Sequence, residues 1–351
     1  MKFTFIKHVK ENDVLAKTIL NDDGTILLSE GTRLSDYYIN KLRENGVFCI
    51  YIKDDALFDI VEDAVFAELK ETTINKLPNI FKDMVLCDEK SFKESITVVE
   101  DLVDYIIDTG SIGNNLYDVK TYDDYTYSHC VDTCIMSSFL GLSMNLGTRE
   151  LKELGTAAIL HDIGKIKISN DIINKNGSLT DEEFAEIKRH PLYGTEILSS
   201  SSLISNSVKS AIIQHHERID GKGYPFGLKS DAICKYARII SVSDVYTALT
   251  TNRSYRKRFT PNEAYEYILS GADSSFDFDV VKSFIDTFAI YPLGCRVKLS
   301  NGIEGYVVKQ NKSLPARPII RVIYDRVTKE RIIPYEIDLI SNLNVVVESV
   351  I

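Results

Sequence analysis

A chain of 351 residues with 44% hydrophobic and 26% charged side chains is long enough for two or three domains and has an ordinary globular composition. Its formal net charge of −10 disfavours non-specific binding to nucleic acid or to an anionic membrane. No apolar run approaches the ~20 residues of a membrane-spanning helix, and the first residues do not resemble a secretory signal. We therefore expect a cytoplasmic protein with no membrane insertion and no nucleic-acid polymer as partner.

The six cysteines show no paired framework of the kind found in secreted disulfide-rich domains. Cys130 and Cys134 lie one helical turn apart beside His129, which leaves a metal-binding pair open as an alternative. Two small residues on a buried helix face are the interpretation that we favour. We expect all six to be reduced and mostly structural: Cys49, Cys87, Cys130, Cys134, Cys234 and Cys295.

Residues 1–55 are expected to form a small α+β unit. Short apolar runs on either side of Asp23-Gly24 are typical of a β-hairpin. The following segment predicts a helix that has Ser35 as its N-cap and ends at Gly46. No residue of this unit indicates chemistry.

The rest of the chain divides into three segments. Residues 56–117 are expected to be a helical linker region, and residues 118–290 a helix-rich domain. Alternating apolar residues around Asn301-Gly302 predict that residues 291–351 form a small β-rich unit. The predicted fold class is therefore mainly α: a central all-helical domain between a small α+β unit and a small β-rich unit.

Five of the six histidines fall in the central helical segment, most of them at predicted helix ends. His161 and Asp162 are adjacent at the end of an apolar run. Neighbouring side chains on a helix point roughly 100° apart, so both serve one site only if other elements converge there. His190 precedes a proline, whose ring biases it away from helical geometry. His215 and His216 close a helix just before a glycine-rich loop.

His129 and Asp244 complete the set of candidate ligands. His129 opens a long predicted helix, whereas Asp244 is a lone carboxylate in a mostly apolar helix, where unpaired burial would be costly. Imidazole together with carboxylate suits Fe, Mn, Zn or Co, and the absence of a Cys-x-x-Cys pattern argues against a closed structural zinc site. The pattern therefore predicts a metal centre rather than scattered structural histidines.

Two motifs carry a resemblance to a known family. "HDIGK" at residues 161–165 and "HHERIDGKGYP" at residues 215–225 resemble the HD-GYP domain, a branch of the HD phosphohydrolase superfamily. The likeness extends through "DDYTYSHC", "KRHPLYG" and "SVSDVYTALTTNRSYRKRFTP", and covers roughly residues 118–290. It implies an all-helical domain that holds two or three metals and hydrolyses cyclic di-GMP. The terminal segments resemble modules that often flank this domain in bacterial proteins.

The resemblance also implies a ligand set and a mechanism. Asp162 would bridge two divalent transition-metal ions, with Fe or Mn expected, and a hydroxide held between the ions would attack phosphorus in line. Family members with a third metal carry a Glu one helical turn before the first histidine. Tyr125 stands there in this chain, so we expect two ions. The implied ligands are His129, His161 and Asp244 for one ion, His190, His215 and His216 for the other, and Asp162 for both.

The resemblance further implies residues that act on the substrate. Lys165, one turn after His161, would place its ammonium on a phosphate oxygen, so that Lys165 and Asp162 take catalytic roles. Arg253 and Arg256 would reach a phosphate and a guanine edge through their planar guanidinium groups. An exposed helix-end lysine and a solvated basic turn are the alternatives for these three cations.

The loop at the end of the second motif is expected to close over the site. Gly223 and Tyr224 would shape this loop, with Tyr224 able to stack or to form a hydrogen bond. Glu217 and Asp220 would orient the histidines from behind.

The leading hypothesis is a metal-dependent phosphodiesterase that hydrolyses cyclic di-GMP to linear pGpG, GMP or both. One alternative is an HD hydrolase of another nucleotide or cyclic dinucleotide, such as cyclic GMP-AMP. Another is a non-catalytic receptor or adaptor; degenerate members usually lose a ligand, and none is lost here. The sequence leaves open the metal, the final product, the roles of the terminal units, protein partners in cyclic di-GMP signalling and a homodimer.

Overall fold

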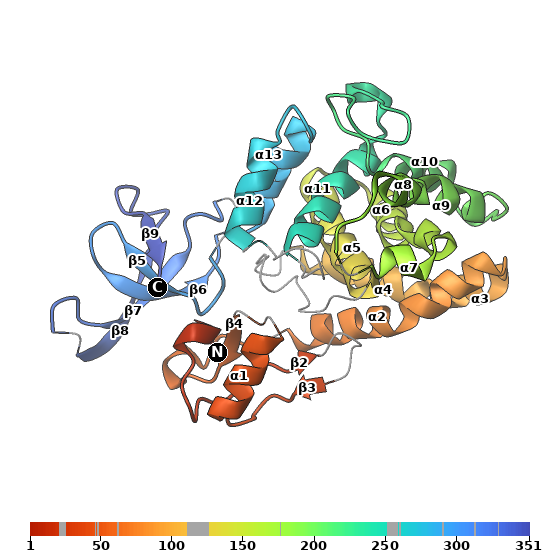
Figure 1. Ribbon diagram of the computed structural model, residues 1–351. Helices are drawn as coiled ribbons and strands as arrows, with labels where there is room; N and C mark the ends of the chain where they lie inside the picture. The colour runs from red at the N-terminus through yellow and green to blue at the C-terminus, as the bar shows by residue number, and fades with distance from the viewer. Residues whose placement is uncertain are drawn as a thin grey trace. The chain divides into compact units, whose positions relative to one another are not determined.

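The computed structural model places the chain in two compact units (Figure 1). The first unit combines residues 1–63 and 285–351, and the second combines the described residues of 64–110 and 126–284. The residues that the structure describes are 1–20, 26–45, 47, 49–61, 63–110, 126–175, 177–250, 259, 261–289, 291–311, 314–328 and 330–351.

The amino-terminal part of the first unit is α+β, as expected. Strands β1 and β4 pair antiparallel, and so do β2 and β3, the strands on either side of the predicted hairpin turn. The Ser35 side chain accepts a hydrogen bond from the Tyr38 N–H and caps α1, which confirms the predicted N-cap. Asp23, Gly24 and Gly46 lie outside the described residues. The elements are β1 (Lys2–Phe5), η1 (Ile6–His8), β2 (Ile19–Leu20), β3 (Ile26–Leu28), α1 (Asp36–Glu44), β4 (Cys49–Ile52) and η2 (Asp55–Leu57).

The carboxy-terminal part of the first unit is a five-stranded antiparallel sheet with strand order β8-β7-β6-β5-β9. The tight turn between β5 and β6 contains Gly302 at a φ of +80°, a left-handed conformation that glycine adopts without strain. The predicted turn at Asn301-Gly302 is thus confirmed. The strands are β5 (Arg296–Leu299), β6 (Glu304–Lys309), β7 (Ile319–Tyr324), β8 (Arg331–Asp338) and β9 (Val347–Val350).

The two ends of the chain share one core. Leu57 and Ile60 pack with Tyr306 and Ile323 of the sheet in a single buried apolar cluster. The terminal segments thus form one compact unit, while the boundaries expected at residues 55, 117 and 290 remain a prediction.

The second unit is all helical, as the fold class requires. Helices α5 and α11 are buried along most of their length, so the polar residues that they carry need partners inside the protein. Helix α9 begins at His190, although the following proline biased that residue away from helical geometry. The elements are α2 (Ala64–Val85), α3 (Glu89–Ser95), α4 (Thr97–Thr109), α5 (Thr126–Ser143), α6 (Thr148–Leu160), η3 (Ile163–Lys167), α7 (Asn170–Ile173), α8 (Asp181–Ile187), α9 (His190–Leu198), α10 (Asn206–Gln214), η4 (Ser230–Ala232), α11 (Lys235–Thr250), α12 (Pro261–Ser270) and α13 (Phe278–Thr287), whose last residues cross into the first unit.

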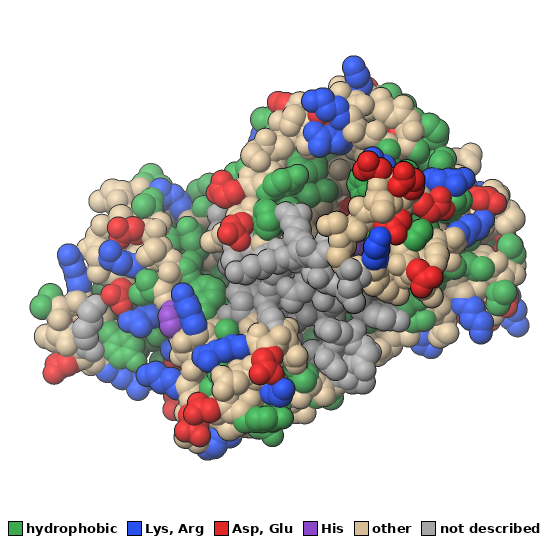
Figure 2. All heavy atoms as spheres, in the orientation of Figure 1, with side chains coloured by type: hydrophobic (Ala, Val, Ile, Leu, Met, Phe, Trp, Pro, Cys, Tyr) green, Lys and Arg blue, Asp and Glu red, His purple; other side chains and the backbone are tan. Residues whose placement is uncertain are grey.

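Packing among these helices brings several helix ends together. Helix α5 packs on α6 and α11, α10 packs on α6, α9 and α11, and α9 packs on η3 (Figure 1). On the face in view, Lys and Arg side chains are interspersed with Asp and Glu side chains (Figure 2). Among the described residues, no helix is both long enough and apolar enough to cross a membrane.

Candidate metal centre

The seven predicted ligands meet inside the second unit. Five elements contribute them: α5, the end of α6, the start of α9, the end of α10, and α11. In each of three overlapping groups, all ligand atoms lie within 4.8 Å of one another. The groups are His129, His161 and Asp162; His161, His215 and Asp244; and His190, His215 and His216.

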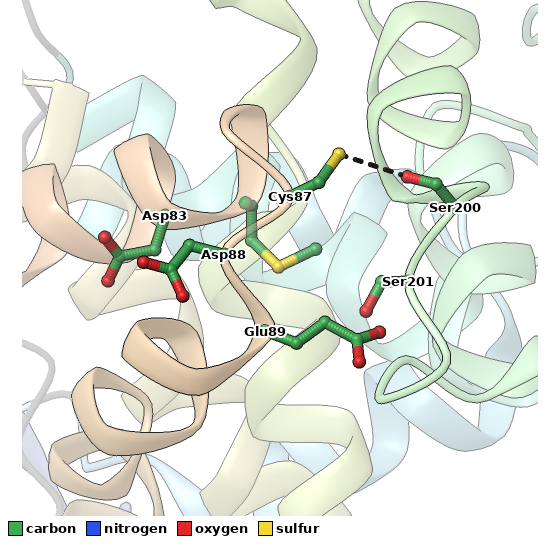
Figure 3. A pocket seen from close by; sticks show the side chains of 7 residues that line it. Asp83, Cys87, Asp88, Glu89, Ser200 and Ser201 are labelled. Carbon is green, nitrogen blue, oxygen red and sulfur yellow. Dashed lines mark hydrogen bonds between the residues drawn. The ribbon is translucent and has the colours of Figure 1, made fainter.

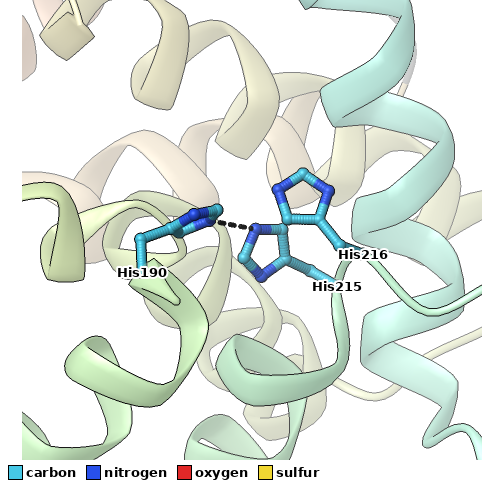
Figure 4. Close-up of side chains that lie close together, drawn as sticks. All are labelled: His190, His215 and His216. Atoms are coloured by element: carbon cyan, nitrogen blue, oxygen red, sulfur yellow. Dashed lines mark hydrogen bonds between the residues drawn. The ribbon is translucent and has the colours of Figure 1, made fainter. Parts of the chain in front are cut away.

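His215 lies at the centre of this arrangement. Its ring centroid is 5.1 Å from that of His161, 5.2 Å from that of His190 and 4.0 Å from that of His216. The Nε2 atoms of His190 and His215 are 3.2 Å apart, and the two rings come from different elements (Figure 4). The shared histidines thus join the three groups into one continuous cluster.

Backbone carbonyls orient three of the imidazoles. The Nδ1 atom of each lies 2.7–2.8 Å from the carbonyl oxygen three residues earlier in the chain. Because a carbonyl only accepts, Nδ1 carries the proton, and the lone pair on Nε2 is left for another partner. The pairs are His161 with Ala158, His190 with Ile187, and His215 with Ile212.

These carbonyl contacts are a local consequence of chain geometry. His161 and His215 are the C-cap residues of α6 and α10, where the last carbonyls of a helix lack intrahelical donors. A histidine directly after a predicted helix is the sequence signal that could have indicated these carbonyl contacts.

The cluster fits a metal ion by a further criterion. The Nε2 atom of His161 is buried and makes no hydrogen bond, and the same holds for the Nδ1 atom of His129. A buried ring nitrogen without a partner is costly in an apoprotein, whereas an ion would bind the Nε2 lone pair of His161.

Asp162 lies between two of the histidines. Its Oδ2 is 3.4 Å from His161 Nε2, and its Oδ1 is 3.3 Å from His190 Nε2. Lys165 donates to Oδ2 at 2.5 Å. Burial raises the pKa of Asp162, but the Lys165 ammonium and the adjacent His161 imidazole lower it by more, so the pKa stays well below the usual range. The carboxylate is therefore ionised and faces both histidine groups.

The histidines at the His190 end of the cluster are neutral at ordinary pH. Burial lowers the pKa of His190 to about 4 and that of His216 to about 3. Burial also lowers the pKa of His215. For His161 burial acts in the same direction, but the neighbouring Asp162 carboxylate raises the pKa above its ordinary value. Neutral imidazole is the form that binds a metal, so burial prepares His190, His215 and His216 as ligands.

Asp244 ties α11 to the other side of the cluster. Its Oδ1 lies 3.0 Å from His129 Nε2 and 3.8 Å from His161 Nε2. One turn further along α5 and α11, the hydroxyls of Thr133 and Thr247 lie 3.0 Å apart in the core. This pair was not predicted, and it sets the spacing of α5 and α11 beside the ligands.

Two glycines of the motifs are required by close packing. A Cβ on Gly164 would lie 1.9 Å from the His190 carbonyl oxygen, so glycine lets η3 approach the start of α9. A Cβ on Gly223 would lie 2.4 Å from the Arg218 backbone nitrogen. The predicted role of Gly223 in shaping the loop is consistent with this contact.

Tyr224 contacts the cluster through His216. Its ring stacks on His216 with centroids 4.7 Å apart and an interplanar angle of 27°. The Tyr224 N–H also donates to the His216 carbonyl at 3.2 Å. Tyr224 therefore contacts one residue, His216, of the cluster over which its loop was expected to close.

The expected roles of Glu217 and Asp220 need correction. The buried Glu217 carboxylate accepts hydrogen bonds from the N–H groups of Phe226 and Leu228, at 2.7 and 2.9 Å. Asp220 pairs with Arg218 and accepts from a backbone N–H of its own loop. Among the described residues, neither carboxylate bonds to a histidine. They hold the loop in place, and backbone carbonyls orient the imidazoles instead.

Three predicted positions lie outside the described residues: Tyr125, Arg253 and Arg256. Cys130 and Cys134 are buried in α5 and belong to none of the three candidate ligand groups found among the described residues. Burial raises the pKa of Cys134 to about 12, so its thiol stays protonated. This supports the structural interpretation of the pair.

A separate small pocket contains none of the predicted ligands. It lies where the turn between α2 and α3 meets the residues after α9, and the Cys87 Sγ is 3.3 Å from the Ser200 Oγ (Figure 3). Carboxylates and hydroxyls dominate its lining: Asp83, Met84, Cys87, Asp88, Glu89, Ser200 and Ser201.

Comparison with known families agrees with this geometry. Residues 128–280 match the HD domain family, and residues 296–351 match the KOW domain associated with HD domains. The HD domain match contains all seven predicted ligands. The resemblance drawn from the two histidine motifs is thereby confirmed.

Two curated relatives carry names that describe an activity. The cyclic di-GMP phosphodiesterase PA4108 of Pseudomonas aeruginosa is 37% identical over 225 residues, which cover 64% of this chain and 54% of the relative. The 3'3'-cGAMP-specific phosphodiesterase 1 of Vibrio cholerae is 31% identical over 186 residues, which cover 51% of this chain and 42% of the relative. The chain thus spans about half the length of the curated relatives that it matches.

A solved structure shares the fold. The HDG"Y"P protein Bd1817 of Bdellovibrio bacteriovorus superposes with a TM-score of 0.53 at 17% identity, over 80% of this chain and 97% of that protein. At this identity, the likeness concerns the fold alone.

Proposed function

We propose that this HD domain is a metal-dependent phosphodiesterase that hydrolyses cyclic di-GMP. The observation that carries the proposal is the convergence of seven imidazole and carboxylate side chains in three overlapping groups. Within them, His161, His190 and His215 turn the Nε2 lone pair away from the carbonyl that binds Nδ1. The printed name of the Pseudomonas aeruginosa relative supports the choice of substrate.

The residues divide between two ions. His129, His161 and Asp244 would hold one, His190, His215 and His216 the other, and Asp162 would serve both. The position of the Asp162 oxygens between His161 and His190 supports this division. When bound, two divalent ions supply Lewis-acid stabilisation of phosphoryl oxygens and lower the pKa of a water molecule. Iron and manganese are the metals that we propose, because imidazole and carboxylate ligands suit both.

Lys165 and the loop would hold the substrate. The Lys165 ammonium is partly exposed and lies against Asp162, so a phosphate bound beside that carboxylate comes within its reach. Tyr224 and Gly223 would border the nucleotide. Arg253 and Arg256 are proposed as further contacts to phosphate and guanine on the basis of the sequence motif. We further propose a cytoplasmic location, with linear pGpG, GMP or both as products.

A second candidate substrate is cyclic GMP-AMP. The Vibrio cholerae relative named as specific for 3'3'-cGAMP favours this possibility. Both cyclic dinucleotides present the same two phosphodiester groups to a metal centre, so the cluster itself does not separate them.

Chromatography of reaction products tests the proposal. Protein loaded with Mn²⁺ or Fe²⁺ is incubated with cyclic di-GMP or with 3'3'-cGAMP, and its metal content is measured by elemental analysis. We expect about two ions per chain and faster hydrolysis of cyclic di-GMP. Asp231→Ala is the control substitution. Its carboxylate is fully exposed, so metal content and turnover should match those of the parent protein. Binding of a cyclic dinucleotide without turnover in any metal would identify a receptor instead. Faster hydrolysis of 3'3'-cGAMP than of cyclic di-GMP would make 3'3'-cGAMP the substrate.

A further inference from the structure

Lys188 follows the last residue of α8 and lies two residues before His190. Its ammonium nitrogen is 4.5 Å from the centroid of the Phe184 ring and 5.8 Å from the centroid of the Tyr224 ring. Two aromatic rings, one from α8 and one from the glycine-rich loop, thus hold this cation by cation–π contact.

The contact with Tyr224 places Lys188 beside the metal centre. The Tyr224 ring stacks on His216 at 4.7 Å, and the His216 ring is 5.0 Å from that of His190. The half-buried lysine therefore lies one aromatic ring away from the group His190, His215 and His216.

Lys188 differs from Lys165, Lys167 and Lys175, whose charges are each paired with a carboxylate. Lys165 pairs with Asp162 at 2.5 Å, Lys167 with Glu196 at 2.9 Å, and Lys175 with Glu183 at 2.6 Å. Within the described part of the chain, no carboxylate oxygen lies within 4.0 Å of the Lys188 ammonium. Aromatic faces orient an ammonium without cancelling its charge, so Lys188 stays able to bind an anion.

We infer that Lys188 is a further substrate-binding residue, whose ammonium contacts a non-bridging phosphate oxygen of the cyclic dinucleotide. This inference rests on the proposed function, because a phosphodiester bound at the cluster is the anion that the cation faces. The rings of Phe184 and Tyr224 hold the ammonium in place before the substrate arrives, which reduces the entropy lost on binding.

Steady-state kinetics on the metal-loaded full chain test this role. Lys188→Met keeps most of the apolar stem and removes the charge, and we expect KM for cyclic di-GMP to rise about tenfold with kcat changed less than about twofold. Lys188→Arg keeps the charge and the cation–π contacts, and should recover most of the loss. Metal content and the melting temperature should match those of the parent protein.

Lys167→Met is the matched control, because Lys167 also lies over a tyrosine ring but is paired with Glu196. Its KM should stay at the parental value. Raising the ionic strength should weaken substrate binding less in Lys188→Met than in the parent, since one screened charge contact is gone.

The possible results separate the inference from the proposed function. If the parent hydrolyses cyclic di-GMP and Lys188→Met has the same KM and salt dependence, the inference is wrong while the function stands. If Lys188→Met loses metal or stability, and Lys188→Arg restores both, the lysine is structural and the inference is equally overturned. If the metal-loaded parent neither binds nor hydrolyses a cyclic dinucleotide, the proposed function fails and the inference fails with it.

Discussion

In the first unit, the Arg321 guanidinium donates to both oxygens of Asp59 at 2.7 Å and to Glu336 at 2.7 and 3.1 Å. In the second unit, the imidazoles of the cluster are held by carbonyls on one side, and His161 Nε2 has no hydrogen bond at all. Both regions bring ionisable groups together, and in the first Arg321 is hydrogen-bonded to both Asp59 and Glu336. The second leaves ring nitrogens of His161 and His129 buried without a hydrogen bond, which is the arrangement expected of a binding site.

The two regions also differ in whether water can replace a side chain that is removed. Asp59 and Glu336 are each more than two-fifths exposed, so water can replace a lost partner around Arg321. Asp162 and His161 are almost completely buried, so neither water nor another side chain can easily substitute for a missing ligand. Substitutions in the cluster should therefore affect function strongly, and those around Arg321 should affect mainly stability.

The largest effect is expected from Asp162→Ala. It removes the carboxylate between His161 and His190, so metal content should fall far below two ions per chain, and turnover should fall more than about a hundredfold. Elemental analysis and product chromatography measure the two quantities, and circular dichroism should show the helical content retained. Activity within about tenfold of the parent would place the shared ligand elsewhere.

Arg253→Ala should lower kcat/KM about tenfold to a hundredfold, the range expected for one charge-assisted contact to phosphate or guanine. Metal content should not change, which would distinguish this residue from the ligands. Arg253→Lys should recover only part of the loss, because an ammonium lacks the planar fork. Unchanged kinetics in Arg253→Ala would show that the basic turn is solvated surface.

Glu217→Gln tests the corrected role of this carboxylate. An amide keeps one acceptor oxygen, so one of the N–H groups of Phe226 and Leu228 loses its partner and the loop that carries Tyr224 shifts. We expect KM to rise about threefold to tenfold with metal content unchanged. Glu182→Gln is the control, because that side chain is exposed at the start of α8. Loss of metal in Glu217→Gln would return the residue to the role of orienting a histidine.

The smallest functional effect is expected from Arg321→Met. Removing a partly exposed ion-pair network should lower the free energy of unfolding by about 1 kcal/mol, measured by denaturant titration. The kcat/KM of the HD domain should change less than about twofold, since Arg321 belongs to the other unit. Arg296→Met removes a single pair with Glu304 on the same sheet and should cost less. A tenfold loss of activity in Arg321→Met would show that the first unit controls the metal centre.

The residues of the cluster could be chosen from the sequence because their signals are local. Apolar runs followed by glycine-rich segments predict the helix ends next to His161 and His215. Imidazole and carboxylate side chains are recognisable from the sequence as common metal ligands. The same local signals indicated the hairpin around β2 and β3 and the turn at Gly302. Family motifs then supplied the grouping into two ion sites, which residue types alone did not determine.

The sequence by itself thus determined the mainly helical class, the β-rich carboxy-terminal segment and the identity of the candidate ligands. The tertiary structure decided which partners these residues have. It directed Glu217 to the backbone of its own loop, placed Lys188 between two rings, and joined the two ends of the chain through Leu57 and Tyr306. The physical reason is that periodicity and helix signals act over a few residues, whereas these contacts depend on how distant segments pack and on which buried donors need an acceptor.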